Sequence, residues 1–171
     1  MSGPKVLNHP VRSNQSKMIL YAAAALSLLA ALIHLWATPE HFEEWPGYGA
    51  FFLVVAVAQG FYGAALLRWP RQLLYYLGIG GNLAIVVLYV ATRTVGIPFF
   101  GPHAGEVEEV GIVDLCATMS ELALTIALGV LVALPRGLSR ERVIMVLLIL
   151  GLAVLFVGHL LHLVLSGSSA H

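Results

Sequence analysis

The hydrophobic positions of this chain form five long apolar runs, and short segments rich in proline, glycine and charge separate them. A transmembrane helix needs about 20 predominantly apolar residues, and each run reaches that length. The pattern therefore predicts an all-α fold, an integral membrane bundle of five transmembrane helices. The predicted helices cover residues 18–38, 47–67, 72–92, 112–134 and 142–165.

The remaining segments are short. We expect residues 1–17 to form a polar amino-terminal arm, residues 18–166 to form the membrane domain and residues 167–171 to form a short tail. The first apolar run is longer than the core of a cleavable signal peptide and lacks the small residues of a cleavage site, so we interpret it as an uncleaved anchor. Pro39 is expected to end this helix, because proline lacks an amide hydrogen and clashes with the preceding turn.

Composition agrees with a membrane protein and excludes several other classes. Charged residues make up 11% of the 171 residues, whereas soluble domains carry roughly 25%. The formal net charge is zero, so no basic field is present to bind nucleic acid. The single cysteine, Cys116, excludes an intramolecular disulfide and any CxxC motif.

The charges of the connecting segments alternate in sign. The amino-terminal arm, the turn at Arg68 and Arg71, and the segment 136–142 are basic, whereas the segments 40–44 and 106–109 are acidic. Basic connections remain on the cytoplasmic side of a membrane. This pattern predicts a multi-pass protein of the bacterial cytoplasmic (inner) membrane, with a cytoplasmic amino terminus and an extracytoplasmic carboxy terminus.

The ionisable residues inside the predicted helices lie close to one side of the membrane. Such residues are costly in a bilayer and mark a partner or a pathway. His159 and His162 share one helix face at a spacing of three. By helical rise, the outer half of the bundle holds His34, Asp114, Glu121, His159 and His162.

Small and polar residues accompany these groups on the same helix faces, which indicates faces that point into the bundle. Ala23, Ser27 and Ala30 share a face with His34, and Thr118 and Thr125 share a face with Glu121. We therefore expect His34, Glu121, His159 and His162 to meet. The polar residues expected to fasten the helices together are Gln59, Asn82 and Thr118.

Histidine and carboxylate side chains together are typical ligands of borderline metal ions. The favoured interpretation is a site for a divalent transition metal (Zn, Fe, Mn or Cu(II)) built from His34, His159, His162, Asp114 and Glu121. One alternative is a haem b-binding electron-transfer subunit, in which His34 and His159 are the axial ligands. Another is a non-catalytic accessory subunit of a larger membrane complex or homo-oligomer, in which the polar groups only lock helices together. Glu121 is also a candidate proton relay.

The two acidic connections predict a vestibule that attracts cations toward this site. Its expected residues are His41, Glu43, Glu44, His103, Glu106, Glu108 and Glu109. The motifs of common soluble hydrolases, GxSxG, HExxH and the P-loop, do not occur in the sequence, so whether the protein is an enzyme is left open.

Two stretches are similar to known sequences. Residues 34–52 and 93–98, followed by Gly101-Pro102 and by residues 110–114 with Glu121, resemble a group of small, uncharacterised bacterial polytopic membrane proteins. The resemblance spans roughly residues 25–130, the first four predicted helices. It implies a membrane fold and brings no activity or catalytic residue with it.

Overall fold

The computed structural model of the protein describes residues 9–133 and 141, and this part of the chain is all-helical. Its long helices are α1 (His9–Glu44), α2 (Pro46–Arg68), α3 (Gln72–Thr94) and α4 (Ile112–Ala133). All four are long and apolar enough to cross a membrane. The prediction of an all-α fold is thus confirmed for the described residues, and their four helices suit a multi-pass membrane protein. The fifth predicted helix, residues 142–165, lies outside the described residues, as does the predicted tail.

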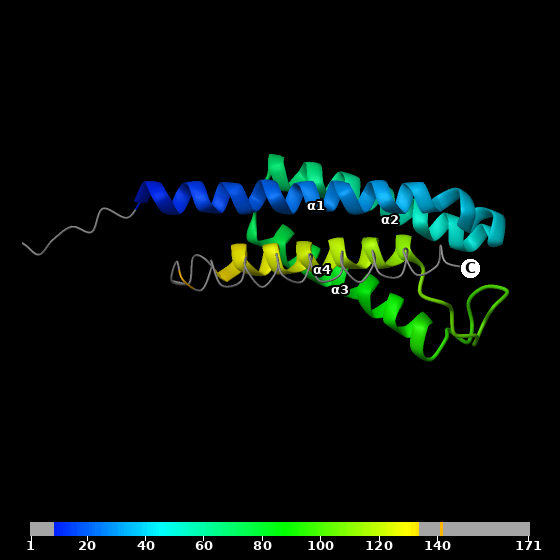
Figure 1. The fold of residues 1–171 in the computed structure, drawn as a ribbon. Coiled ribbons are helices and arrows are strands. Elements are labelled where there is room, and N and C mark those ends of the chain that lie inside the picture. Colours follow the sequence, from blue (N-terminus) through cyan, green and yellow to red (C-terminus); the bar gives the residue numbers. More distant parts are fainter. Residues whose placement is uncertain (1–8, 134–140, 142–171) are drawn as a thin grey trace, which may run out of the picture.

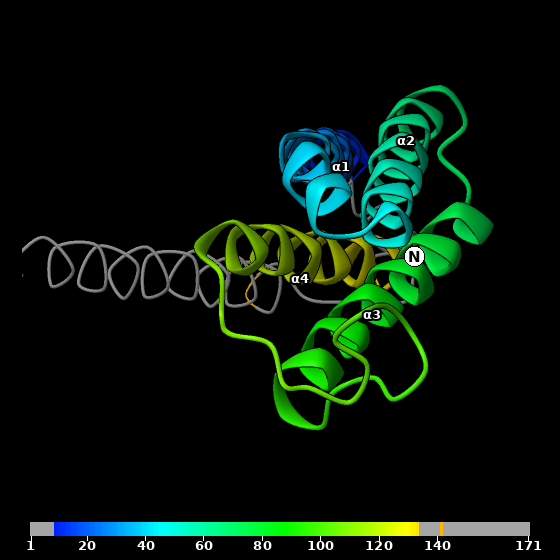
Figure 2. The same cartoon turned by 90° about the vertical axis from the view of Figure 1, so that its right-hand side faces the viewer.

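The helices pack as two antiparallel pairs (Figures 1 and 2). α1 lies along α2 and also packs against α4, and α4 packs in turn against α3. α3 is inclined to the other helices, and it moves away from α2 toward the end of the bundle that carries the loop of residues 95–111 (Figure 1). The turn between α1 and α2 lies at that same end, which we call the loop end.

α1 is longer than predicted at both ends: it begins at His9, within the predicted polar arm, and Pro39 does not end it. The proline lies inside the helix, which continues to Glu44. The proline removes the amide that would donate to the Leu35 carbonyl, four residues earlier. The Thr38 hydroxyl donates to the neighbouring carbonyl, that of His34, over 2.8 Å. The helix stops instead before Pro46, which occupies the first turn of α2 while Trp45 is extended. Proline is well suited to that first position.

The buried face of α1 is the predicted face of small residues. Ala23, Ser27 and Ala30 are fully buried, and His34 is 4% exposed. Lipid chains are as apolar as leucine, so close packing rather than removal from water holds such helices together. A Cβ added at Gly63 of α2 would lie 3.2 Å from the carbonyl oxygen of Ala24. A side chain at Gly63 would therefore crowd α1, so the glycine allows the two helices to approach closely.

Candidate functional site

The centre of the site is one carboxylate oxygen that joins three helices. Oε1 of Glu121 (α4) lies 2.9 Å from Nε2 of His34 (α1). The Nε2 amide of Gln59 (α2) donates to the same oxygen over 3.0 Å. Glu121 is fully buried, and His34 and Gln59 are 4% and 6% exposed. The chain therefore brings together an acid, an imidazole and an amide from positions 34, 59 and 121.

These residues lie deep in the bundle. Glu121 is nine residues from the start of α4 and His34 is ten residues from the end of α1, so at 1.5 Å per residue each is about 14 or 15 Å from the loop end of its helix. Sequence reasoning predicted this shared depth. Contact between the two side chains, which the sequence could only suggest, is a feature of the structure.

The second polar atom of each of these side chains has no hydrogen-bond partner in the part of the chain that the structure describes. These atoms are Nδ1 of His34, Oε1 of Gln59 and Oε2 of Glu121. An unsatisfied buried donor or acceptor costs about 1–3 kcal/mol. When a neutral imidazole donates its Nε2 hydrogen to the carboxylate, Nδ1 is an acceptor. All three free atoms are then acceptors, which suits a cation or a donor.

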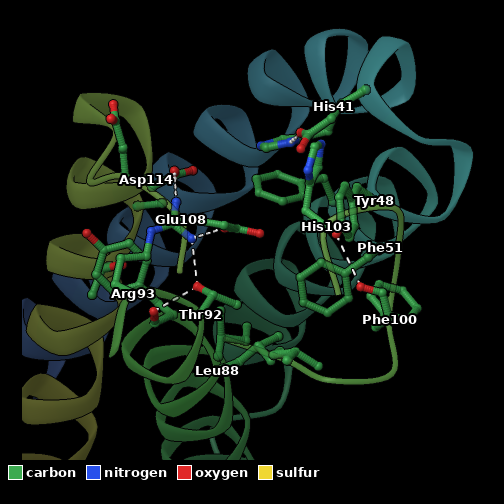
Figure 3. A pocket seen from close by; sticks show the side chains of 18 of the residues that line it. His41, Tyr48, Phe51, Leu88, Thr92, Arg93, Phe100, His103, Glu108 and Asp114 are labelled. Carbon is green, nitrogen blue, oxygen red and sulfur yellow. Dashed lines mark hydrogen bonds and ion pairs between the residues drawn. The ribbon is translucent and has the colours of Figure 1, made fainter. Parts of the chain in front are cut away.

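One cavity of about 410 Å³ is lined by this buried pair and by residues of the loop end. Figure 3 shows the part of it between His41, His103 and Arg93. His34, Thr118 and Glu121 line its inner end, which we call the floor. The divergence of α3 from α2 provides its width. Acidic residues of the α1 end and of the loop line its opening, which we call the mouth: Glu44, Glu106, Glu108 and Glu109.

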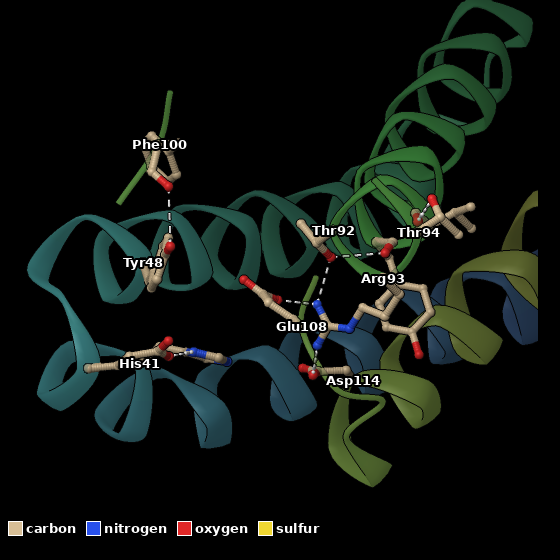
Figure 4. Close-up of polar contacts among 11 residues, drawn as sticks. His41, Tyr48, Thr92, Arg93, Thr94, Phe100, Glu108 and Asp114 are labelled. Atoms are coloured by element: carbon tan, nitrogen blue, oxygen red, sulfur yellow. Dashed lines mark hydrogen bonds and ion pairs between the residues drawn. The ribbon is translucent and has the colours of Figure 1, made fainter. Parts of the chain in front are cut away.

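Arg93, at the end of α3, organises one side of the cavity (Figure 4). Its Nη2 lies 2.6 Å from Oδ2 of Asp114, its Nη1 binds Glu108, and the guanidinium lies over the ring of Tyr89 at 4.8 Å. Arginine is well suited to such multiple pairing. Arg93 thereby ties the loop to α3 and to the first turn of α4.

Sequence reasoning did not single out Arg93. The available signal was its position, a lone cation between an apolar run and three glutamates. Asp114, which was expected among the metal ligands, is engaged by Arg93. It does not join His34 and Glu121 in a group: the described residues contain no cluster of three histidine, cysteine, aspartate or glutamate side chains able to hold a metal ion. His159 and His162 lie outside the described residues.

Most of the expected vestibule residues line the mouth of the cavity. His41 pairs with Glu44 at 3.3 Å, and His103 pairs with Glu106 at 3.0 Å. Glu109 is exposed and lines the cavity, whereas Glu43 is exposed and is not among the lining residues.

The three polar residues expected to fasten helices differ in what they contact. Gln59 links α2 to α4 through Glu121, and its backbone carbonyl accepts a 2.7 Å hydrogen bond from Ser27 of α1. Asn82 is buried, but its amide donates to Gly78 of its own helix, and its Oδ1 has no partner among the described residues. Thr118 is buried beside the floor of the cavity.

Comparisons of the chain with protein-family models, with curated proteins and with solved structures find no significant match. The geometry of the site therefore carries the functional argument.

Proposed function

We propose that this membrane protein binds a divalent transition metal ion at the floor of the cavity, with His34 and Glu121 as ligands. The observation that carries the proposal is the single cavity that joins an acidic mouth to a buried imidazole–carboxylate pair. Ionisable residues inside an apolar helix bundle are costly and point to a functional site.

The spacing of the pair supports a shared metal ion. Two ligand atoms that each lie about 2.1 Å from a zinc ion are roughly 3.0–3.4 Å apart at the usual angles. Nε2 of His34 and Oε1 of Glu121 are 2.9 Å apart. An ion can therefore replace their hydrogen bond with only a small movement of the side chains.

The charge of the cavity supports a cation rather than an anion. Six carboxylates line it, from Glu44, Glu106, Glu108, Glu109, Asp114 and Glu121, and Arg93 is the one arginine or lysine among its described lining residues. A cleft of one charge sign between low-dielectric walls concentrates counter-ions. Arg68 and Arg71 lie at the opposite end of the bundle, so the positive-inside rule favours a mouth that opens to the extracytoplasmic side.

Two protein ligands are too few for a stable transition-metal site, which usually has three or four. We propose His159 and His162 as the remaining ligands, because their spacing presents both imidazoles on one helix face.

In the haem b alternative, the His34 imidazole gives up its contact with Glu121 and binds the haem iron instead. The accessory-subunit alternative treats the junction of His34, Gln59 and Glu121 only as a helix lock.

Metal retention separates these alternatives. The detergent-purified protein is loaded with Zn²⁺, desalted and examined by elemental analysis and visible absorption, beside His34→Gln and, as a matched control, His103→Gln at the exposed loop. We expect about one ion per chain in the native protein and the control, and loss in His34→Gln, since one ligand of a few is removed. A Soret band would replace the proposal with haem. Equal retention in both variants, or none in the native protein, would refute it.

A further inference from the structure

The cavity is larger and more apolar than a metal ion requires. Its volume of about 410 Å³ falls in the range of small-molecule sites, roughly 300–1,000 Å³. Between the mouth and the floor its walls are aromatic and aliphatic. Representative wall residues are Tyr48, Phe51 and Phe52 of α2, Leu88 and Tyr89 of α3, and Phe100 of the loop.

The aromatic rings near the mouth are held by one another. Trp45 packs edge-on against Tyr48 and Phe100, with ring centres 5.2 and 5.0 Å apart. The Tyr48 hydroxyl donates to the Phe100 carbonyl over 3.2 Å. Deeper, the centre of the Phe52 ring lies 3.8 Å from the centre of the His41 ring and 5.4 Å from that of the His34 ring. Phe52 therefore bridges the mouth and the floor, and aromatic faces of this kind attract organic cations.

The floor requires hydrogen-bond donors from its ligand. His34 and Glu121 are more than nine-tenths buried, and Nδ1 of the first and Oε2 of the second have no partner among the described residues. Both residues line the cavity, and because the two free atoms are themselves buried, a ligand reaches them only when the side chains move slightly. A primary ammonium carries three donors and a positive charge, so it matches the floor in both respects. A quaternary ammonium carries only the charge.

We propose that the cavity binds a protonated primary amine with an apolar body of about the size of a phenyl ring. The ammonium donates to Glu121 and His34, and the body lies against Phe52, Leu88 and the neighbouring rings. The acidic mouth attracts the amine. This inference goes beyond the metal site and does not rest on it. Its basis is the free acceptor atoms at the floor, the apolar walls of the cavity and the negative charge of its mouth. A metal ion and an amine would compete for the same floor.

The probe is 2-phenylethylammonium, titrated calorimetrically into metal-free, EDTA-treated protein in detergent. Two matched compounds accompany it: neutral 2-phenylethanol, and trimethyl(2-phenylethyl)ammonium, which keeps the charge and lacks the donors. We expect saturable binding of the primary amine, at least tenfold tighter than that of either compound, because a charged hydrogen bond contributes about ten- to hundredfold. Equal affinity for the alcohol or for the quaternary compound would overturn the proposal.

Protein variants locate the site. Glu121→Gln should weaken binding of the primary amine at least tenfold, whereas Glu109→Gln at the exposed mouth should weaken it less than threefold, since exposed charges are screened. Leu88→Trp fills the cavity from α3, leaves Glu121 unchanged, and should abolish binding. Equal losses in the two glutamate variants, or full binding by a folded Leu88→Trp, would refute the proposal. Metal retention is measured separately, so failure here leaves the metal proposal standing.

Discussion

At the scale of single residues, Oε1 of Glu121 joins three helices, because it contacts both His34 and Gln59. Helical rise was sufficient to predict the common depth of His34 and Glu121. The contact with Gln59 depends on how α2 is rotated about its axis. Small residues occur on several faces of α2, so its sequence does not specify which face packs against α4. Gln59 was therefore predicted as a helix-packing residue without a defined partner.

Gln59→Ala should lower the free energy of unfolding, because it removes an interhelical hydrogen bond to a buried carboxylate. We expect a loss of about 1–2 kcal/mol, the upper part of the range for polar contacts between membrane helices. Unfolding by SDS in mixed micelles, followed by circular dichroism, measures it. Asn82→Ala is the matched control, since that amide donates within its own helix, and it should cost less. A loss for Asn82→Ala equal to that for Gln59→Ala would contradict the assigned role of Gln59.

At the scale of helices and loops, the boundaries of α2, α3 and α4 followed from apolar run length and proline position. α1 did not follow that pattern. The rule that proline ends a helix assumes that the freed carbonyl and the ring clash are costly, yet α1 continues through Pro39 for another five residues, to Glu44. The loop was the least predictable element. Arg93 at the end of α3 pairs with Glu108 of the loop and with Asp114 of α4, and no helical or strand periodicity in the sequence links these three positions.

Gly63→Val should separate α1 from α2. Its Cβ would lie 3.2 Å from the Ala24 carbonyl and against the Leu28 side chain, and overpacking of this kind typically costs about 1–3 kcal/mol. Gly60→Val in the same helix is the matched control, because a Cβ there meets nothing within 4 Å. Thermal unfolding in detergent should show a lower midpoint for Gly63→Val than for Gly60→Val. Equal midpoints would argue against the close approach of the two backbones.

At the scale of the whole molecule, residues of all four apolar helices and of the acidic loop line one cavity, and that loop lies at one end of the bundle (Figure 1). Composition and run length predicted the membrane class and the helical architecture. The cavity itself was not predictable, because it arises from the inclination of α3, which no local pattern specifies.

The proposed orientation predicts which loop a membrane-impermeant thiol reagent reaches in intact cells. In a Cys116→Ala background, Ala104→Cys in the loop should react from outside, whereas Arg71→Cys at the α2–α3 turn should react only after lysis. The reason is that basic turns stay in the cytoplasm. Labelling of Arg71→Cys but not Ala104→Cys in intact cells would reverse the orientation and direct the cavity toward the cytoplasm.

The central claim is that His34 and Glu121 together hold a metal ion at the floor of the cavity. X-ray absorption of the Zn²⁺-loaded protein tests it most directly, because imidazole ligands scatter distinctively and zinc–nitrogen distances are about 2.0–2.1 Å. We expect nitrogen and oxygen ligands that include imidazole, and a reduced imidazole contribution in His34→Gln but not in His103→Gln. A coordination sphere without imidazole, or one unchanged by His34→Gln, would contradict the account.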